Sequence, residues 1–288
     1  MIEIGRHQLF SVITGHIRLD GGAMFGVVPR VLWEQKARPD DHHRIRMAMR
    51  TLVALDREAG RVILVDTGVG DKWGAEEADR FAIEVRPRAL ADALAPYGLT
   101  EADVTDIVVT HLHFDHNGGL TEWEEGPGGR TRLRFPQARH WVHEQHWRHA
   151  TAPTERDRAS FLDRDLEALG RAGVLRFVTG DDPPAAFKGV GWCVSHGHTP
   201  YQLLPLFEGE GGGLLFVGDL IPTMAHLPVP WIMAYDVAPL VTLEEKKGVY
   251  RRCREEGLSL AFPHDPEAGG VSVGWVQDKP IVARVLDL

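Results

Sequence analysis

The stretch T-H-L-H-F-D-H-N-G-G, residues 110–119, constrains the fold more than any other part of the sequence. It places three histidines and one aspartate within six residues, directly after the apolar run Ile107–Val109. An apolar run of this kind predicts a buried strand, and buried imidazoles require polar partners or a ligand. The chain must therefore fold so that other polar groups meet this cluster where the strand ends.

Three later segments offer such groups, and each of them follows an apolar strand. They contain His198 in S-H-G-H-T-P, Asp219 in L-F-V-G-D-L and His264 in A-F-P-H-D-P. Binding sites are often built where strands give way to loops on a rigid scaffold. The resulting candidate set has seven members: His111, His113, Asp115, His116, His198, Asp219 and His264.

The spacing within this set indicates metal binding. His111 and His113 are two residues apart, so they point the same way on an extended segment. The Gly-Gly pair at 118–119 lets the chain turn, so that Asp115 and His116 can reach a second point nearby. Imidazole and carboxylate groups suit zinc and similar divalent ions. Seven ligands exceed one tetrahedral shell and fit two ions that share one carboxylate.

The pattern of strands and helices predicts an α/β fold in a single domain, residues 1–288, with two packed sheets and helices outside. An N-terminal β-rich third precedes a helical middle, and the Gly-rich segment 122–132 is expected to form a hairpin loop. We expect strands at 7–19, 47–56, 61–66, 106–110, 174–178, 190–195, 201–207, 214–217 and 258–262. Helices are expected at 87–97, at 154–169 and at 242–257, where Thr242 and Glu245 suggest a capping box.

Five short motifs resemble those of the metallo-β-lactamase superfamily, and they occur in that family's order. The segment 111–116 matches its H-x-H-x-D-H signature, and 66–68 matches its D-T-G motif. Gly197–Pro200, Gly218–Asp219 and Pro263–His264 resemble its three later motifs. The resemblance implies a four-layer αβ/βα sandwich with two divalent metal ions at one edge of the sheets. Zinc is the expected metal, with iron, manganese or cobalt as alternatives.

The resemblance also implies a role for each residue. One ion would be held by His111, His113 and His198, the other by Asp115, His116 and His264, with Asp219 shared by both. Asp66 would not bind an ion directly but would orient a ligand or a bound water. Asp115 and Asp66 are therefore the candidate catalytic residues.

Hydrolysis is the chemistry that such a centre favours. Two ions can lower the pKa of a water between them, so that hydroxide attacks an electrophile at neutral pH without a nucleophilic Ser or Cys. The chain resembles the branch of quorum-quenching lactonases and methyl-parathion-hydrolase-like enzymes, which implies a small, apolar ester or lactone substrate. Those lactonases carry a Tyr three residues after the shared Asp; Pro222 stands there in this chain, so Tyr201 or Tyr235 is the candidate replacement.

Two alternatives stay open. Within the same class, the chain could hydrolyse phosphoesters or phosphotriesters. In a different class, it could be a mononuclear iron persulfide dioxygenase. Counting the bound metal ions and measuring oxygen consumption separates the second alternative from a hydrolase.

Two apolar segments, 23–33 and 223–235, are expected to wall the substrate site. Phe25, Trp33, Trp231 and His226 are the candidate pocket residues within them. The histidines of the segment 140–149 are expected to be solvated or to serve packing, with no role as ligands.

Composition narrows the classes of partner. The net charge is −9 and no basic run stands out, which argues against a nucleic-acid partner. No apolar run approaches the roughly 20 residues of a membrane span, and the first residues do not form a signal peptide. We therefore expect a cytoplasmic protein that acts on a small molecule, and a homodimer is a possible assembly.

Overall fold

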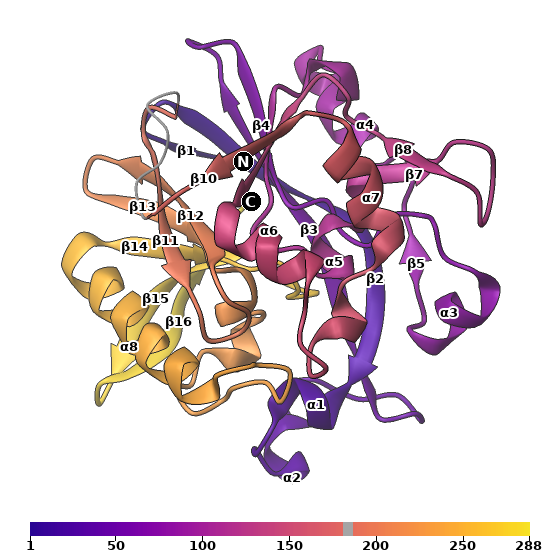
Figure 1. Cartoon of the computed structure of the whole chain (residues 1–288). Coiled ribbons are helices and arrows are strands. Elements are labelled where there is room, and N and C mark those ends of the chain that lie inside the picture. The colour runs from indigo at the N-terminus through magenta and orange to yellow at the C-terminus, as the bar shows by residue number, and fades with distance from the viewer. Residues whose placement is uncertain (181–186) are drawn as a thin grey trace.

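Two β-sheets packed face to face form the centre of the molecule, and helices cover their outer surfaces (Figure 1). The computed structural model describes residues 1–180 and 187–288. No helix in these residues is long and apolar enough to cross a membrane.

The first sheet is built from the N-terminal part of the chain. Its strands follow one another in the spatial order β1 (Ile2–Ile4), β2 (His7–Asp20), β3 (Arg44–Asp56), β4 (Arg61–Val65), β6 (Asp106–Val108), β9 (Arg139–His143) and β10 (Leu175–Val178), with β5 (Glu84–Val85) paired to β2. The pairs from β1 to β4 are antiparallel, and those from β4 to β10 are parallel.

The second sheet comes from the C-terminal part. Its order is β11 (Val190–Ser195), β12 (Gln202–Gly209), β13 (Gly212–Phe216), β14 (Leu258–Ala261), β15 (Gly270–Val276) and β16 (Lys279–Val285). β13 and β14 pair in parallel, and the other pairs are antiparallel. A separate hairpin joins β7 (Thr121–Trp123) to β8 (Thr131–Leu133), as expected for the Gly-rich segment.

Some helices form the outer layers, and others lie in the connections between elements. The outer-layer helices are α4 (Ala89–Leu94), α6 (Glu144–Thr151), α7 (Asp163–Arg171) and α8 (Pro239–Glu256). The helices in the connections are α1 (Gly21–Phe25), α2 (Arg30–Trp33), α3 (Ala75–Arg80) and α5 (Phe114–Asn117). Single 3-10 turns are η1 (Ala95–Tyr97), η2 (Glu101–Asp103), η3 (Gly118–Leu120), η4 (Arg158–Ser160), η5 (Gly218–Leu220) and η6 (Met224–His226).

Three stacked hydrophobic clusters hold these layers together. Alternate residues of β3 face opposite ways: Val53 packs towards α4 and α7, whereas Leu52 packs towards the second sheet. On the far side, Leu215 of β13 and Tyr250 of α8 belong to one hydrophobic cluster. Figure 1 shows α8 beside β14 and β15, away from α4 and α7. The result is the expected four-layer αβ/βα sandwich.

All three expected helices have different bounds in the structure. The helix expected over 87–97 is an α-helix only over Ala89–Leu94 and continues as the 3-10 turn η1. The helix expected over 154–169 covers only Asp163–Arg171, because Asp157 instead accepts hydrogen bonds from the backbone and hydroxyl of Thr154 and holds the preceding segment in a turn. The helix expected from 242 begins at Pro239, which suits the first helical position. The expected capping box of Thr242 and Glu245 is therefore wrong, since both side chains bind other loops.

The strand that leads to the histidine cluster ends at Val108, two residues earlier than expected. Asp66 is the reason, because its carboxylate accepts hydrogen bonds from the backbone N–H and the hydroxyl of Thr110, both at 2.8 Å. These bonds turn the chain out of the sheet directly before His111.

Candidate metal centre

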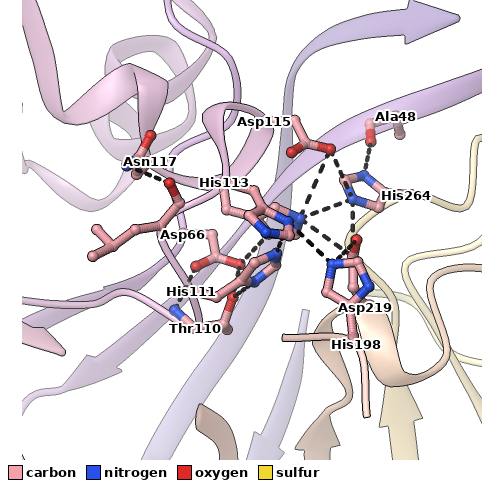
Figure 2. A network of polar contacts seen from close by, with 12 residues as sticks. Ala48, Asp66, Thr110, His111, His113, Asp115, Asn117, His198, Asp219 and His264 are labelled. Atoms are coloured by element: carbon pink, nitrogen blue, oxygen red, sulfur yellow. Dashed lines mark hydrogen bonds and ion pairs between the residues drawn. The ribbon is translucent and has the colours of Figure 1, made fainter. Parts of the chain in front are cut away.

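Three imidazole nitrogens from two distant segments of the chain converge at one edge of the two sheets (Figure 2). Nδ1 of His113 lies 3.1 Å from Nε2 of His111 and 3.1 Å from Nε2 of His198. All three side chains are buried. We refer to His111, His113 and His198 as the first group.

A second group lies beside the first and consists of Asp115, His116, Asp219 and His264. Nε2 of His116 and Nε2 of His264 are 3.0 Å apart, and Oδ1 of Asp219 lies within 3.2 Å of both. Oδ2 of Asp115 is 3.5 Å from Nε2 of His264. The seven residues predicted from the sequence are therefore all brought together.

Asp219 lies between the two groups. Its Oδ1 faces His116 and His264, while its Oδ2 is 3.3 Å from Nε2 of His198 in the first group. Oδ1 is buried, yet no hydrogen bond satisfies it among the described residues. A buried carboxylate oxygen surrounded by imidazole nitrogens is a donor set that suits divalent ions such as zinc. The residues present therefore fit metal ions in both groups.

Each ligand is delivered from the end of a strand. His111 and His113 follow β6, and the short helix α5 then carries Asp115 and His116. The remaining three ligands follow β11, β13 and β14 of the second sheet. Backbone hydrogen bonds from Leu203 to Thr110 and from Ala48 to His264 join the sheets at this edge. Two sheets packed at one edge thus determine the position of the site.

Outer contacts fix the orientation of most of the imidazoles. Oδ2 of Asp66 accepts from Nδ1 of His116 at 2.8 Å, and the carbonyl of Ala48 accepts from Nδ1 of His264 at 3.0 Å. Nδ1 of His111 lies 3.0 Å from the hydroxyl oxygen of Thr110, which itself donates to Asp66. In the neutral form of these three rings Nδ1 carries the proton, so Nε2 presents a lone pair to the centre.

Sequence reasoning missed the residue that orients His198. Asp236 is buried, its Oδ1 accepts from Nδ1 of His198 at 2.9 Å, and its Oδ2 accepts from the hydroxyl of Thr242 at 2.6 Å. Carboxylates in such positions orient metal-binding histidines. Asp236 lies in a loop before α8 and does not follow an apolar strand, so the pattern that identified the other residues could not identify it.

The electrostatics of the centre suit metal binding. Burial, followed by neighbouring imidazoles, holds the pKa of His111 and of His113 well below the usual range. Burial alone would raise the pKa of Asp219, but His116, His264 and His198 together hold it well below its usual range. Burial alone would lower the pKa of His116, but Asp219, Asp115 and Asp66 together raise it well above its usual range. A metal ion at this residue must displace that proton, because a histidine ligand is a neutral imidazole.

The expected pocket residues lie deeper than predicted. Phe25 and Trp33 are 0% and 3% exposed and stack on each other with centroids 5.3 Å apart. Both nitrogens of His226 are engaged, by Thr223 and by the carbonyl of Met24. These three residues fill a core layer instead of an open wall, because an apolar sequence segment looks the same in both settings. Trp231 is half-buried at the edge of that layer.

Half-buried aromatic side chains lie next to the ligands in another place. Phe114, between His113 and Asp115 in the sequence, contacts Trp73 and Phe81 with centroid distances of 5.3 and 5.5 Å. Phe114 lies in α5, which also carries Asp115 and His116, and the other two rings pack against Phe114. In the sequence, the position of Phe114 inside the histidine motif was the one feature that could have identified it as a neighbour of the site.

The two candidate tyrosines occupy different surroundings. The ring of Tyr201 stacks on His143 with centroids 4.8 Å apart. Tyr235 is 41% exposed, and burial together with the carboxylates of Asp20 and Asp115 raises its pKa to about 12. Tyr235 is thus the tyrosine within electrostatic reach of a second-group carboxylate.

The histidines of the segment 140–149 belong to neither group. His146 is nevertheless fully buried, and it joins two ligand loops. Its Nε2 accepts from the N–H of Leu112 at 2.8 Å, and its Nδ1 donates to the carbonyl of Pro200 at 2.7 Å. A solvated role is therefore wrong for His146, which links the loop of the first two histidines to the loop of His198.

Comparison with known proteins agrees with this geometry. Residues 51–257 match the model of the metallo-beta-lactamase superfamily. An N-acyl homoserine lactonase AttM from Azorhizobium caulinodans is 22% identical over 216 residues, covering 73% of this chain and 77% of the relative. The AttM of Rhizobium radiobacter is also 22% identical, over 215 residues.

Solved structures share the fold along nearly the whole chain. A probable metal-dependent hydrolase from Staphylococcus aureus has 26% identity and a TM-score of 0.84, covering 99% of this chain and 100% of that one. The dizinc quorum-quenching lactonase AidC, bound to the product N-hexanoyl-L-homoserine, has 20% identity and a TM-score of 0.77, covering 98% and 95%.

Proposed function

The chain belongs to the metallo-β-lactamase superfamily and is a metal-dependent hydrolase, and we propose that it uses two divalent ions to hydrolyse a small, apolar lactone or ester. The observation that carries this proposal is the position of Asp219, whose two carboxylate oxygens face two separate groups of buried ligands. The lactonase names of the relatives support the lactone as substrate.

The first group and the second group would each hold one ion, with zinc the expected metal and iron, manganese or cobalt as alternatives. Such ions would supply Lewis acidity and a nucleophile derived from water at neutral pH. Asp66 and Asp236 would not bind the ions themselves. Each would accept a hydrogen bond from Nδ1 of a ligand, His116 or His198, and so keep the tautomer that presents Nε2 to the centre.

Asp115 is the second-group carboxylate that we assign to proton transfer. Hydrolysis of a lactone forms a bond from a water oxygen to the carbonyl carbon and breaks the ring C–O bond. The proton lost by the water must reach the leaving alkoxide oxygen. Asp115 lies beside His264 at the centre and is 8% exposed, so it can take up that proton and return it.

The substrate's apolar part would contact the half-buried aromatic residues nearest the ligands. Phe114 adjoins both groups in the chain, and Trp73 and Phe81 extend the same surface. Trp231 and Tyr235 lie in the loop between Asp219 and α8, and we assign them to the opposite side. These aromatic side chains favour an acyl chain over a highly charged substrate.

A substrate panel on metal-loaded protein tests the proposal. It should contain lactones with short and long acyl chains, aryl esters, and aryl phosphotriesters. We expect kcat/KM to be highest for acylated lactones and lowest for the phosphotriesters. Preference for phosphotriesters would assign the chain to that class, and oxygen consumption with one iron per chain would assign it to the dioxygenases.

A further inference from the structure

Helix α8 contacts two of the loops that adjoin the metal centre, and it does so with two adjacent charged residues. We propose that Glu245 and Lys246 are positioning residues: Glu245 holds the loop 195–198 that supplies His198, and Lys246 holds the loop 226–231 that follows Asp219. This inference concerns the positions of two loops and does not rest on the proposed substrate.

Glu245 satisfies three donors of the first loop. Its carboxylate accepts from the hydroxyl of Ser195 at 2.7 Å and from the backbone N–H groups of His196 at 2.7 Å and Gly197 at 3.2 Å. Hydrogen bonds to an ionised acceptor are stronger than those between neutral groups. The carboxylate therefore ties down the residues directly before the ligand His198.

The first loop also approaches the helix too closely for any side chain at position 197. A Cβ on Gly197 would lie 2.6 Å from Cα of Thr242, well inside contact distance. Backbone bonds from Ala238 to Gly197 and from Val237 to His198 close the same junction. Glycine at 197 is thus required by the contact with α8.

Lys246 binds the second loop as a hydrogen-bond donor, whereas Glu245 binds the first loop as an acceptor. It is fully buried, and its ammonium group donates to the carbonyls of His226, Pro228 and Trp231 at 2.6, 2.9 and 2.9 Å. An ammonium has three N–H donors, so all three are used by one loop. A buried charge is costly unless it is fully hydrogen bonded, and these three carbonyls provide the hydrogen bonds that offset that cost.

The helix geometry explains how neighbours serve different loops. Adjacent residues on an α-helix point about 100° apart, so Glu245 and Lys246 face different sides of α8. The chemistry matches each side, because a carboxylate can only accept from N–H groups and an ammonium can only donate to carbonyls. Tyr250, one turn further on, donates its hydroxyl to the carbonyl of Leu227 in the second loop.

The flanking residues provide matched controls. Glu244 and Lys247 are exposed on the same helix and form an ion pair with each other at 2.7 Å. Glu245→Ala is compared with Glu244→Ala, and Lys246→Met with Lys247→Met. Two measurements apply to every variant: zinc affinity by chelator competition, and amide hydrogen exchange of residues 195–198 and 226–231 in the zinc-loaded protein.

Glu245→Ala should lower zinc affinity by roughly 10- to 100-fold, the range seen when an outer partner of a ligand is removed, and should speed exchange at 196 and 197. Glu245→Gln, which keeps one acceptor oxygen, should recover part of the affinity. Lys246→Met should instead speed exchange in 226–231 by at least about tenfold while zinc affinity stays within about threefold. Neither control should change either measurement.

The proposal is overturned if both substitutions affect both loops equally, or if they behave like their controls. If Lys246→Met does not fold, Lys246→Gln, which keeps two donors, takes its place, and unchanged exchange in 226–231 then overturns the assignment of Lys246. A chain that hydrolyses no lactone but shows this separation between loops would contradict the proposed substrate and leave the positioning roles standing.

Discussion

Nε2 of His116 and Nε2 of His264 lie 3.0 Å apart, although 148 positions separate the two residues in the chain. Nδ1 of each ring donates outward, to Asp66 and to the carbonyl of Ala48, so in the neutral rings both inward nitrogens present lone pairs. Two lone pairs at this distance repel unless a cation lies close to both. The fold holds the pair in place through buried outer partners, and its geometry therefore suits a bound ion.

Metal content follows from this arrangement. We expect two divalent ions per chain at saturation, and removal of the ions by a chelator should lower the melting temperature, because binding to the folded state stabilises it. Elemental analysis of dialysed, zinc-loaded protein and thermal melts with and without chelator measure both effects. Saturation at one ion per chain would exclude the shared role of Asp219.

Asp219→Asn should lower kcat/KM by at least about 100-fold and release metal, since the amide cannot supply two anionic oxygens to the two groups. Glu267→Gln is the control, because Glu267 is an exposed carboxylate three residues after His264. The measurements are steady-state kinetics and residual metal after gel filtration. Equal losses in the two variants would show that Asp219 has no special position.

Asp236→Asn should weaken zinc binding by roughly 10- to 100-fold, because the amide accepts less strongly from Nδ1 of His198 and can present N–H to it. The effect should appear at one ion only, since Asp236 contacts the first group and not the second. Absorption of the cobalt-substituted protein distinguishes loss of one ion from loss of both. Loss of both ions together would mean that the substitution acts on the whole fold.

Trp231→Ala and Phe25→Ala should behave differently. Phe25 is fully buried, so its removal should cost about 3–5 kcal/mol of the free energy of unfolding. Trp231 is half-buried near the proposed acyl site, so its removal should mainly raise KM for long-chain substrates by roughly tenfold. Urea unfolding and chain-length profiles check this, and a Trp231 variant that is strongly destabilised with an unchanged profile would assign Trp231 to the core.

Stability should fall in acid because of buried neutral histidines. Burial lowers the pKa of His140 to about 4, below the 6.5 expected in the unfolded chain. Between these values the unfolded state binds one more proton, so stability is full above pH 6.5 and falls by about 1.4 kcal/mol per pH unit as pH drops towards 4.

His140→Asn tests this contribution. Asparagine cannot titrate, and its amide can still donate to the carbonyl of Ala138, which Nδ1 of His140 contacts at 3.0 Å. Urea unfolding of both proteins at several values of pH should show a shallower acid slope in the variant. Parallel slopes would mean that His140 is protonated in the folded state as readily as in the unfolded chain.

Local pattern was sufficient to predict the layers and the ligands. Alternation in the strands and the apolar runs before His111, Asp219 and His264 are properties of neighbouring residues, and they recur in the structure. The chemistry of imidazole and carboxylate then limits what such residues can bind. This is why seven side chains from four separate segments could be predicted to meet.

The residues that hold the ligands and their loops from outside the metal centre could be identified only from the tertiary structure. Asp236, Glu245 and Lys246 act on loops that lie far away in the sequence, and Glu245 was expected to cap its own helix. Phe25 and Trp33 were expected in a pocket wall, yet packing buries them. Hydrophobicity sets whether a side chain avoids water, but which surface covers it depends on contacts between distant segments, and these form only when the layers assemble.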